Sequence, residues 1–528
     1  MAMTLAKVAC RAQIGLHAPL VQVEVSLGAG LPAFSIVGLP ATVVKESRER
    51  VRAALTNSNF EFPAGHITVN LAPADVPKEG GRFDLPIALG VLLASGQISP
   101  AFDPLSVEFY GELGLGGELK PVHSLLVAAA NAAVRGHEII VPRGDAEDAR
   151  LASDGLIRAA DHLLEVCDHL TGVRPLPDYL SRRGGPRVKT LATDSLLDLR
   201  DVRGQFQAKQ ALVIAAAGGH SLLLIGPPGS GKSMLAQRLP GLLPPLTVAE
   251  SIEVASIASL SVVGFDRAGY ARRPFRTPHH TASAPALVGG GRRATPGEVS
   301  LAHHGVLFLD ELPEFPRATL EALREPLESG VVSVSRAAVR AQYPAAFQLV
   351  AAMNPCPCGY QGDPLSDCNC SPARVQHYRG KISGPLFERI DMHVEVPRVL
   401  EDEFGEATDR GESTSSAAER VVRARQIQLA RQATCNARLS DSQVDRWCKP
   451  DRAGHNILQR CMTKFGLSAR TRARVLKIAR TIADLAEEET VTASHVSQAV
   501  LLRCLDRRRL EGAMDYSAPE NKSPEILF

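Results

Sequence analysis

Residues 226–233 of this chain read Gly226-Pro227-Pro228-Gly229-Ser230-Gly231-Lys232-Ser233, and they follow the apolar run Ser221-Leu-Leu-Leu-Ile225. The apolar run predicts a buried strand, and the glycines after it predict a tight turn into a helix. The pattern G-x-x-x-x-G-K-[ST] is typical of a loop whose backbone N–H groups surround phosphate oxygens at a helix N-terminus. We therefore expect Lys232 to contact the terminal phosphates of a nucleotide and the Ser233 hydroxyl to bind Mg²⁺.

A second apolar run, Val306-Leu-Phe-Leu309, ends in the two carboxylates of Asp310 and Glu311. Two carboxylates at the end of a buried strand are suited to bind a nucleotide together with its metal ion. Asp310 is predicted to join the Mg²⁺ ligands, and Glu311 is predicted to orient the water that attacks the γ-phosphate. The two segments together predict that the chain binds and hydrolyses a nucleoside triphosphate such as ATP.

The composition predicts a large protein with several hydrophobic cores. Of the 528 residues, 45% are hydrophobic, and we expect about three domains. The net charge of +2 by itself indicates neither a nucleic acid nor a membrane as partner. No apolar stretch reaches the ~18 residues of a membrane span, and the first residues lack the pattern of a secretory signal. Ten cysteines in a chain of this size are no disulfide framework, so we expect a soluble, cytoplasmic protein.

The pattern of elements changes along the chain and predicts a multidomain fold. Runs of alternating polarity at 21–27 and 66–71 predict strands, and runs at 41–57 and 85–94 predict helices. The later alternation of strands and helices is typical of a doubly wound α/β core. The predicted order is an α+β domain at 1–170, a linker at 171–195, an α/β core at 196–396, a flexible linker at 397–418, an all-α domain at 419–510 and a tail at 511–528.

Further polar residues border the predicted strands of the core. Asn354 follows a third apolar run and can sense the γ-phosphate or orient water, although an Asn that caps the turn before Pro355 explains it equally well. Arg389 precedes another predicted strand, from which it can reach the nucleotide of a neighbouring subunit. A predicted helix at 466–480 places Arg470, Arg474 and Lys477 on one face, which is either functional or a solvated basic surface.

Four cysteines lie close together as Cys356-Pro-Cys358 and Cys368-Asn-Cys370. Four thiolates in a loop rich in glycine and proline can hold Zn²⁺ in a tetrahedral site, although one residue between paired ligands is a tighter spacing than usual. A redox-sensitive pair or free cysteines are the alternatives. Because the loop lies between Asn354 and Arg389, we expect a metal there to brace a subunit interface rather than to take part in chemistry.

From about residue 200 onward the chain resembles the AAA+ ATPases related to magnesium chelatase, and over nearly its whole length it resembles the ComM/YifB family. The segments that carry the resemblance are the P-loop, Arg273–Thr281, Gly289–Gly291, Pro296–Glu298, Asp310–Phe315, Arg324–Glu328 and the four-cysteine stretch. The resemblance implies ATP and Mg²⁺ as ligands, Asn354 as sensor 1, Arg389 as an arginine finger in trans and Arg470 as sensor 2. Since a finger in trans needs a neighbour, the resemblance also implies a ring, expected to be a homo-hexamer.

Between the P-loop helix and the acidic strand, the segment Arg272–Glu298 is rich in Gly, Pro, Arg and His without clean periodicity and predicts a long ordered loop. The resemblance implies that an insertion at about 264–298 projects into the pore of the ring. His279 and His280 within it are expected to stabilise the loop by hydrogen bonds rather than to bind a metal. Four arginines suit contacts with DNA phosphates, the alternative being that they hold subunit interfaces together; they are Arg292, Arg293, Arg336 and Arg340.

The first domain resembles the peptidase domain of Lon-type proteases at residues 77–89 and 111–121. That fold uses a serine–lysine dyad. The serine position falls on Arg82 and the lysine position on Leu126, and neither residue can act as nucleophile or base. We therefore expect a Lon-protease-like domain without proteolytic activity, which organises the ring or binds a partner or DNA.

The resemblance implies that the ATPase is a hexameric DNA helicase. Such a helicase promotes branch migration and the integration of single-stranded DNA by homologous recombination in natural transformation. The expected partners are single-stranded or branched DNA and further copies of the chain, with no membrane. The alternative is a magnesium-chelatase-like ATPase that remodels a protein partner, although such subunits generally lack the Lon-like first domain. Arg82 and Leu126 count against an ATP-dependent protease.

Overall fold

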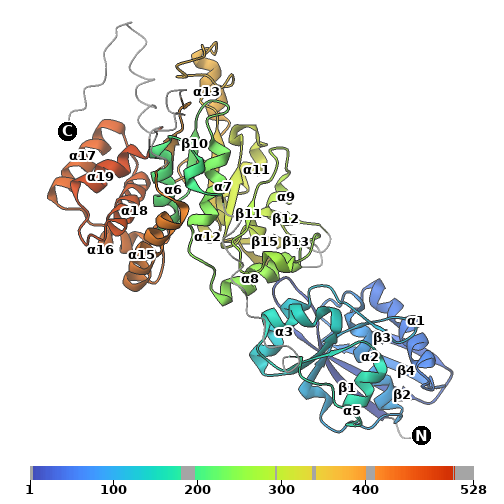
Figure 1. The fold of residues 1–528 in the computed structure, drawn as a ribbon. Helices are drawn as coiled ribbons and strands as arrows, with labels where there is room; N and C mark the ends of the chain where they lie inside the picture. The colour runs from blue at the N-terminus through green and yellow to red at the C-terminus, as the bar shows by residue number, and fades with distance from the viewer. Residues whose placement is uncertain are drawn as a thin grey trace.

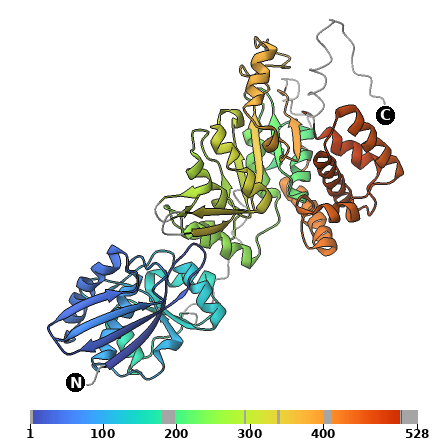
Figure 2. The ribbon, with the colours of Figure 1, turned by 180° about the vertical axis from the view of Figure 1, so that it is seen from behind.

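The computed structural model describes residues 4–179, 197–291, 294–335, 340–399, 411–503 and 505. Figures 1 and 2 show three parts in chain order: an N-terminal sheet with its helices, a second α/β part and a C-terminal group of helices. Most of the first predicted linker, residues 400–410 of the second and the whole predicted tail lie outside the described residues. The predicted domain boundaries in those segments therefore remain predictions.

The N-terminal part is built on a mixed seven-stranded sheet in the order β3-β4-β2-β1-β5-β8-β9. β2 pairs antiparallel with β1 and β4, whereas the other neighbours pair in parallel. The strands are β1 Thr4–Arg11, β2 Leu20–Gly28, β3 Ala33–Val37, β4 His66–Ala72, β5 Val107–Phe109, β8 Glu138–Pro142 and β9 Ile157–Ala160, with a separate hairpin of β6 Glu112–Leu113 and β7 Leu119–Lys120. The helices are α1 Thr42–Asn57, α2 Asp84–Ala94, α3 Leu125–Arg135, α4 Ala146–Ala152 and α5 Leu163–Leu170.

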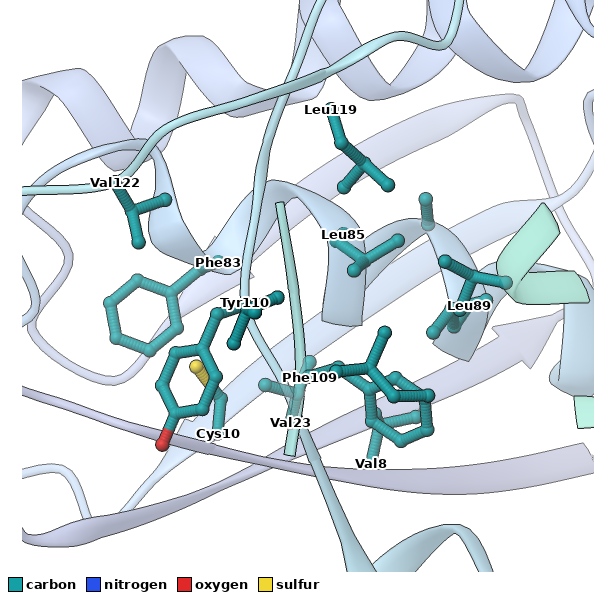
Figure 3. Packing of buried hydrophobic residues seen from close by; sticks show 14 of the residues in the cluster. Val8, Cys10, Val23, Phe83, Leu85, Leu89, Phe109, Tyr110, Leu119 and Val122 are labelled. Carbon is teal, nitrogen blue, oxygen red and sulfur yellow. The ribbon is translucent and has the colours of Figure 1, made fainter. Parts of the chain in front are cut away.

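The core of this part forms around α2, whose sequence is apolar on nearly every side and which is therefore buried. Figure 3 shows Leu85 and Leu89 of this helix above residues of the sheet, among them Val8 and Phe109. Helix and sheet approach so closely that a Cβ at Gly90 would lie 2.5 Å from a methyl group of Val25. Glycine at this position allows the close packing.

The second part contains a five-stranded parallel sheet in the order β11-β14-β17-β10-β18. Its strands are β10 Leu222–Ile225, β11 Phe275–Arg276, β14 Val306–Leu309, β17 Gln348–Met353 and β18 Met392–Glu395. Around it lie α6 Phe206–Gly218, α7 Lys232–Leu242, α8 Val248–Ser259, α9 Ala284–Val288, α10 Glu298–Leu301, α11 Arg317–Glu321, α12 Arg324–Ser329, α13 Pro372–Gly380 and α14 Gly384–Phe387. Two hairpins complete it: β12 Gly289–Gly290 with β13 Thr295–Pro296, and β15 Val331–Ser335 with β16 Arg340–Pro344. Its central strands are buried, which explains their unbroken apolar runs.

The C-terminal part is helical throughout its described residues. It consists of α15 Thr414–Gln432, α16 Asp441–Trp447, α17 Arg452–Phe465, α18 Ala469–Leu485 and α19 Ala493–Leu501. α15 begins before the predicted position 419 because the Ser413 side chain caps it by accepting a hydrogen bond from the Ser416 N–H. The helices share one hydrophobic cluster with α6, α7 and the sheet, so this part packs firmly on the α/β core.

The N-terminal part contacts α8 and the segment after it, as Figure 1 shows. Ala255, Phe265 and Tyr270 pack against its hydrophobic core. The Ser124 hydroxyl donates a 3.0 Å hydrogen bond to the carbonyl of Ser259, and Arg267 forms an ion pair with Glu147 at 2.6 Å. The first residues of the segment predicted as a pore insertion thus lie on the N-terminal part, and the placement of the rest in a pore remains a prediction.

The strands and helices with the clearest periodicity are confirmed. The alternating runs at 21–27 and 66–71 are β2 and β4, and the predicted helices at 41–57 and 85–94 are α1 and α2. Mixed α/β sheets followed by a helical C-terminal part agree with the predicted fold class, whereas the likeness of the first domain to Lon-type proteases remains a prediction.

Candidate nucleotide-binding site

Three loops meet at the carboxyl edge of the parallel sheet. The P-loop follows β10, Asp310 follows β14 and Asn354 follows β17, and these strands are neighbours. Because parallel strands end at the same edge, residues far apart in the sequence lie together there, where ligands of open α/β sheets bind. Gly231, with φ of 91°, turns the chain into α7, whose first residue is Lys232.

Lys232 is surrounded by oxygen atoms. Its Nζ donates hydrogen bonds to the carbonyls of Gly226 and Pro227, both at 2.8 Å, and to Oδ1 of Asn354 at 3.2 Å. Burial lowers the pKa of Lys232, while the charges of Asp310 and Glu311 oppose that shift. The ammonium group is thus held at the P-loop by acceptors of the kind that phosphate oxygens provide.

Ser233 and Asp310 form the predicted metal-binding pair. The Ser233 hydroxyl donates to Oδ2 of Asp310 at 2.8 Å, and Oδ1 of Asp310 accepts the N–H of Glu311 at 2.9 Å. A hydroxyl and a carboxylate in contact at the start of a P-loop helix are oxygen ligands suited to Mg²⁺. The donor set therefore fits the cation that accompanies a nucleotide.

Glu311 lies beside this pair in an unusual backbone conformation. Its φ is 52°, in the left-handed region that residues other than glycine rarely adopt, and such backbone strain gathers at functional sites. Nδ1 of His280 lies 3.3 Å from Oε2 of Glu311, whereas His279 contacts Thr281. The contact of His280 with Glu311 was not predicted, because periodicity cannot place a residue of an irregular loop.

The predicted arginines lie at the other edge of the sheet. Arg389 precedes β18, just as Ser221 precedes β10, and the Ser221 hydroxyl donates to the carbonyl of Arg389 at 3.1 Å. β18 is four residues long. At ~3.3 Å per residue the two edges are about 13 Å apart. Arg389 and the P-loop of one chain therefore lie at opposite edges.

Arg389 and Arg470 line one cavity of about 510 Å³ at this amino edge, together with Glu328, Arg474 and Lys477. Arg389 is held by an ion pair with Glu328 and by a hydrogen bond to the carbonyl of Pro385 at 2.6 Å, and its side chain is 11% exposed. Arg470 is 73% exposed and lies 3.9 Å from Glu388. The structure thus brings together two arginines that the sequence places far apart.

Asp391 connects Arg474, and through it Arg389, to the start of β10. Its carboxylate accepts the Ser221 N–H at 3.0 Å and hydroxyl at 3.1 Å, and it also pairs with Arg474, which in turn donates to the carbonyl of Arg389 at 3.0 Å. Burial alone would raise the pKa of Asp391, but His220, Arg474 and the Ser221 N–H outweigh it and hold this pKa well below its usual range. The roles of Asp391 and Glu328 could not be predicted, since their partners are distant in the chain.

The four cysteines converge. The Sγ atoms of Cys356, Cys358, Cys368 and Cys370 all lie within 4.8 Å of one another, and three of the separations are 3.3, 3.5 and 3.6 Å. None of the four is in a disulfide. Ligand atoms of a tetrahedral zinc site, each ~2.3 Å from the metal, are about 3.8 Å apart. The cluster therefore has the size and donor set of a four-thiolate zinc site.

The residues predicted to contact DNA fall largely outside the described residues. Arg292, Arg293 and Arg336 are among the residues left undescribed, between the paired strands of two hairpins in the sequence, and Arg340 begins β16.

Within the described ranges, no helix combines the length and the apolar character needed to cross a bilayer.

Three family models match the chain in the order of its parts. They are described as "Subunit ChlI of Mg-chelatase" for residues 23–145, "Magnesium chelatase, subunit ChlI" for 198–404 and "Magnesium chelatase, subunit ChlI C-terminal" for 411–503. Fold, P-loop geometry and these matches define a magnesium-chelatase-like AAA+ protein, a class that implies ATP and Mg²⁺ as ligands and points to ATPase activity.

Relatives that match over nearly their full length show to which family of this class the chain belongs. The competence protein ComM of Haemophilus influenzae is 47% identical over 506 residues, which are 96% of this chain and 98% of the relative. The YifB protein of Salmonella typhimurium is 46% identical with the same coverage. The chain belongs to the ComM/YifB family. By contrast, the magnesium-chelatase 67 kDa subunit of Chlorobaculum parvum is 27% identical over 30% of this chain and 24% of its own length.

Replacement of Asp391 tests the network at the amino edge. Asp391→Asn removes the charge that pairs with Arg474, and breaking a buried pair costs about 3–5 kcal/mol of unfolding free energy. The exposed Asp441→Asn, at the same cavity, is the control and is expected to change little. Denaturant unfolding of both variants measures the difference, and equal stabilities would contradict the role given to Asp391.

The free energy of unfolding of the wild type, compared with that of Asp391→Asn, is also expected to depend on pH. The folded pKa of Asp391 lies below the unfolded value of about 3.9, so its contribution to stability is present above that pH and is lost as the pH falls further. The stabilities of wild type and Asp391→Asn therefore converge in acid.

Proposed function

We propose that the chain is an ATP-driven motor that acts, as a ring of identical copies, on single-stranded or branched DNA. The observation that carries the proposal is the division of the ATPase residues between two edges of one sheet. Since Arg389 and Arg470 lie at the edge opposite the P-loop, they act on the nucleotide of a neighbouring copy. Repeated around an axis, such a head-to-tail contact closes into a ring, which we take to be a hexamer.

Each nucleotide site then combines residues of two copies. One copy supplies Lys232 and the P-loop N–H groups for the phosphates, Ser233 and Asp310 for Mg²⁺, and Glu311 to orient the attacking water. Asn354 acts as sensor 1, and its hydrogen bond with Lys232 supports this role. The neighbour supplies Arg389 as the arginine finger and Arg470 as sensor 2, whose positive charges stabilise the transition state.

DNA as the track is supported by the family and by charge. The Haemophilus influenzae relative carries the name of a competence protein, which favours a role linked to DNA. In the sequence, Arg292 and Arg293 lie between β12 and β13, Arg336 lies between β15 and β16, and Arg340 begins β16; all four would supply sequence-independent contacts with phosphates. We infer that the motor drives branch migration in the cytoplasm and thereby promotes integration of single-stranded DNA in natural transformation.

We further propose that the four cysteines bind Zn²⁺. Their number, their sulfur separations and their position in a loop without disulfides support a structural site with four thiolate ligands. Such a site has no open position for a substrate, so its contribution is to order the loop.

The DNA motor is tested by the ATPase rate of the purified chain with and without single-stranded and branched DNA. We expect DNA to raise turnover at moderate salt. Glu311→Gln is the matched control: it is expected to bind ATP like the wild type and to lose turnover by about a hundredfold or more. An ATPase that DNA neither stimulates nor retains would instead favour the alternative, a motor that remodels a protein partner.

The action of Arg389 in trans is tested by mixing two inactive variants. Arg389→Ala is expected to lower turnover by about 10³-fold or more, while its P-loop stays intact. In random mixed rings, a P-loop of an Arg389→Ala copy meets the finger of a Glu311→Gln copy at about a quarter of the sites, so the mixture should regain up to about a quarter of wild-type activity. A mixture that stays inactive although the subunits exchange would show that Arg389 acts on its own P-loop.

Zinc is tested by metal analysis of the purified chain. We expect about one Zn²⁺ per chain, and loss of the metal from Cys368→Ser, with the distant Cys461→Ser as control. Less than about half an equivalent in the wild type would argue against the site.

A further inference from the structure

The loop that carries the cysteines lies against the P-loop of the same chain. Gly359, next to Cys358, has φ of +90°, and a Cβ built there would lie 2.7 Å from Cδ and 2.9 Å from Cγ of Pro228. The same Cβ would lie 3.8 Å from Cγ of Asn354. The backbone of the cysteine loop is therefore in direct contact with the phosphate-binding loop and next to the side chain that contacts Lys232.

Other contacts hold the cysteine loop at the same edge of the sheet. At its start, the carbonyl of Pro355 accepts hydrogen bonds from Nε and Nη2 of Arg379 in α13, at 3.2 and 3.0 Å. In its middle, the buried carboxylate of Asp363 lies 3.5 Å from Arg398, which follows β18. Figure 1 shows α13, the helix after the cysteines, beyond the end of β10. The loop thus spans the chain segments that leave β17, β10 and β18.

Regular secondary structure contributes nothing to the rigidity of this loop. Residues 355–371 are all described and form neither helix nor strand. The four thiols bring its two ends together, with Cys356 and Cys358 at one end and Cys368 and Cys370 at the other. A metal bound there closes the loop on itself and removes the conformational freedom that nucleotide binding would otherwise have to restrict.

We propose that the metal-bound cysteine loop is a wall of the ATP pocket, so that zinc sets the affinity of the chain for ATP. The inference rests on the zinc site proposed above. Zinc holds Gly359 against Pro228, and this contact holds the P-loop in its phosphate-binding conformation. The site therefore acts within one chain, on its own P-loop, and it acts on nucleotide binding rather than on the assembly of subunits.

Two glycines of the loop provide a matched test. Gly359→Ala leaves all four cysteines in place but puts a methyl group into Pro228, and we expect about tenfold weaker binding of a fluorescent ATP analogue with the zinc content unchanged. Gly362→Ala is the control, because Gly362 also has a positive φ, +79°, yet a Cβ there would meet nothing within 4 Å. We expect Gly362→Ala to bind the analogue like the wild type.

Removal of the metal from the wild-type chain provides the second arm. A mercurial reagent releases the zinc into a colorimetric chelator, and dithiothreitol with Zn²⁺ then restores the site. Affinity for the ATP analogue should fall as zinc is released and recover as it is returned, while circular dichroism shows that the chain stays folded.

Three results would overturn the inference: equal affinities for Gly359→Ala and Gly362→Ala, unchanged affinity in a folded chain that has lost its zinc, or a wild-type chain without zinc. These measurements contain no DNA. A negative result would therefore contradict the role of zinc in ATP binding without bearing on the proposed action of the motor on DNA.

Discussion

The parallel pairing of β10 with β17 on one side and with β18 on the other determines where each functional side chain can act. It puts the P-loop, Asp310 and Asn354 at one edge of the sheet, and it puts Ser221, Arg389 and Asp391 at the other. A strand of four residues, about 13 Å long, separates the two edges. In the proposed ring, this pairing makes each chain half of two ATPase sites, and the proposed need for a neighbour follows from the direction of the strands.

The residues predicted from the sequence are those whose chemistry is local. The P-loop is a strand, a turn and a helix in one short stretch, so the turn alone puts Lys232 and Ser233 at the helix N-terminus where phosphates are predicted to bind. Asn354 was ambiguous because a turn cap and a sensor look alike in sequence, and its contact with Lys232 comes from the pairing of β17 with β10. His280, Glu328 and Asp391 could not be predicted, since each gains its meaning from a partner more than thirty residues away or in an irregular loop.

On α18, periodicity predicts which residues share one face of the helix, but it does not predict what those residues contact. Arg470, Arg474 and Lys477 do lie on one side, and all three line the cavity at the amino edge. Of these three residues, only Arg470 is solvated as the alternative of a solvated basic surface predicts. Arg474 pairs with Asp391, and Lys477 donates to the carbonyl of Ala437 at 3.1 Å. One turn of helix thus separates the exposed Arg470, proposed to meet a neighbour's nucleotide, from Arg474, which contacts Asp391 and the carbonyl of Arg389.

The helix α8 gives the N-terminal part a physical connection to the nucleotide site. One side of α8 packs on that part through Ala255, and Oε2 of Glu253 on the same helix lies 3.1 and 3.0 Å from Nε2 of His303 and His304. These histidines directly precede β14, the strand that ends at Asp310. Packed elements transmit displacements because interiors have little free space. A shift of β14 would therefore move the contacts that hold the N-terminal part, so α8 links that part mechanically to the candidate nucleotide site.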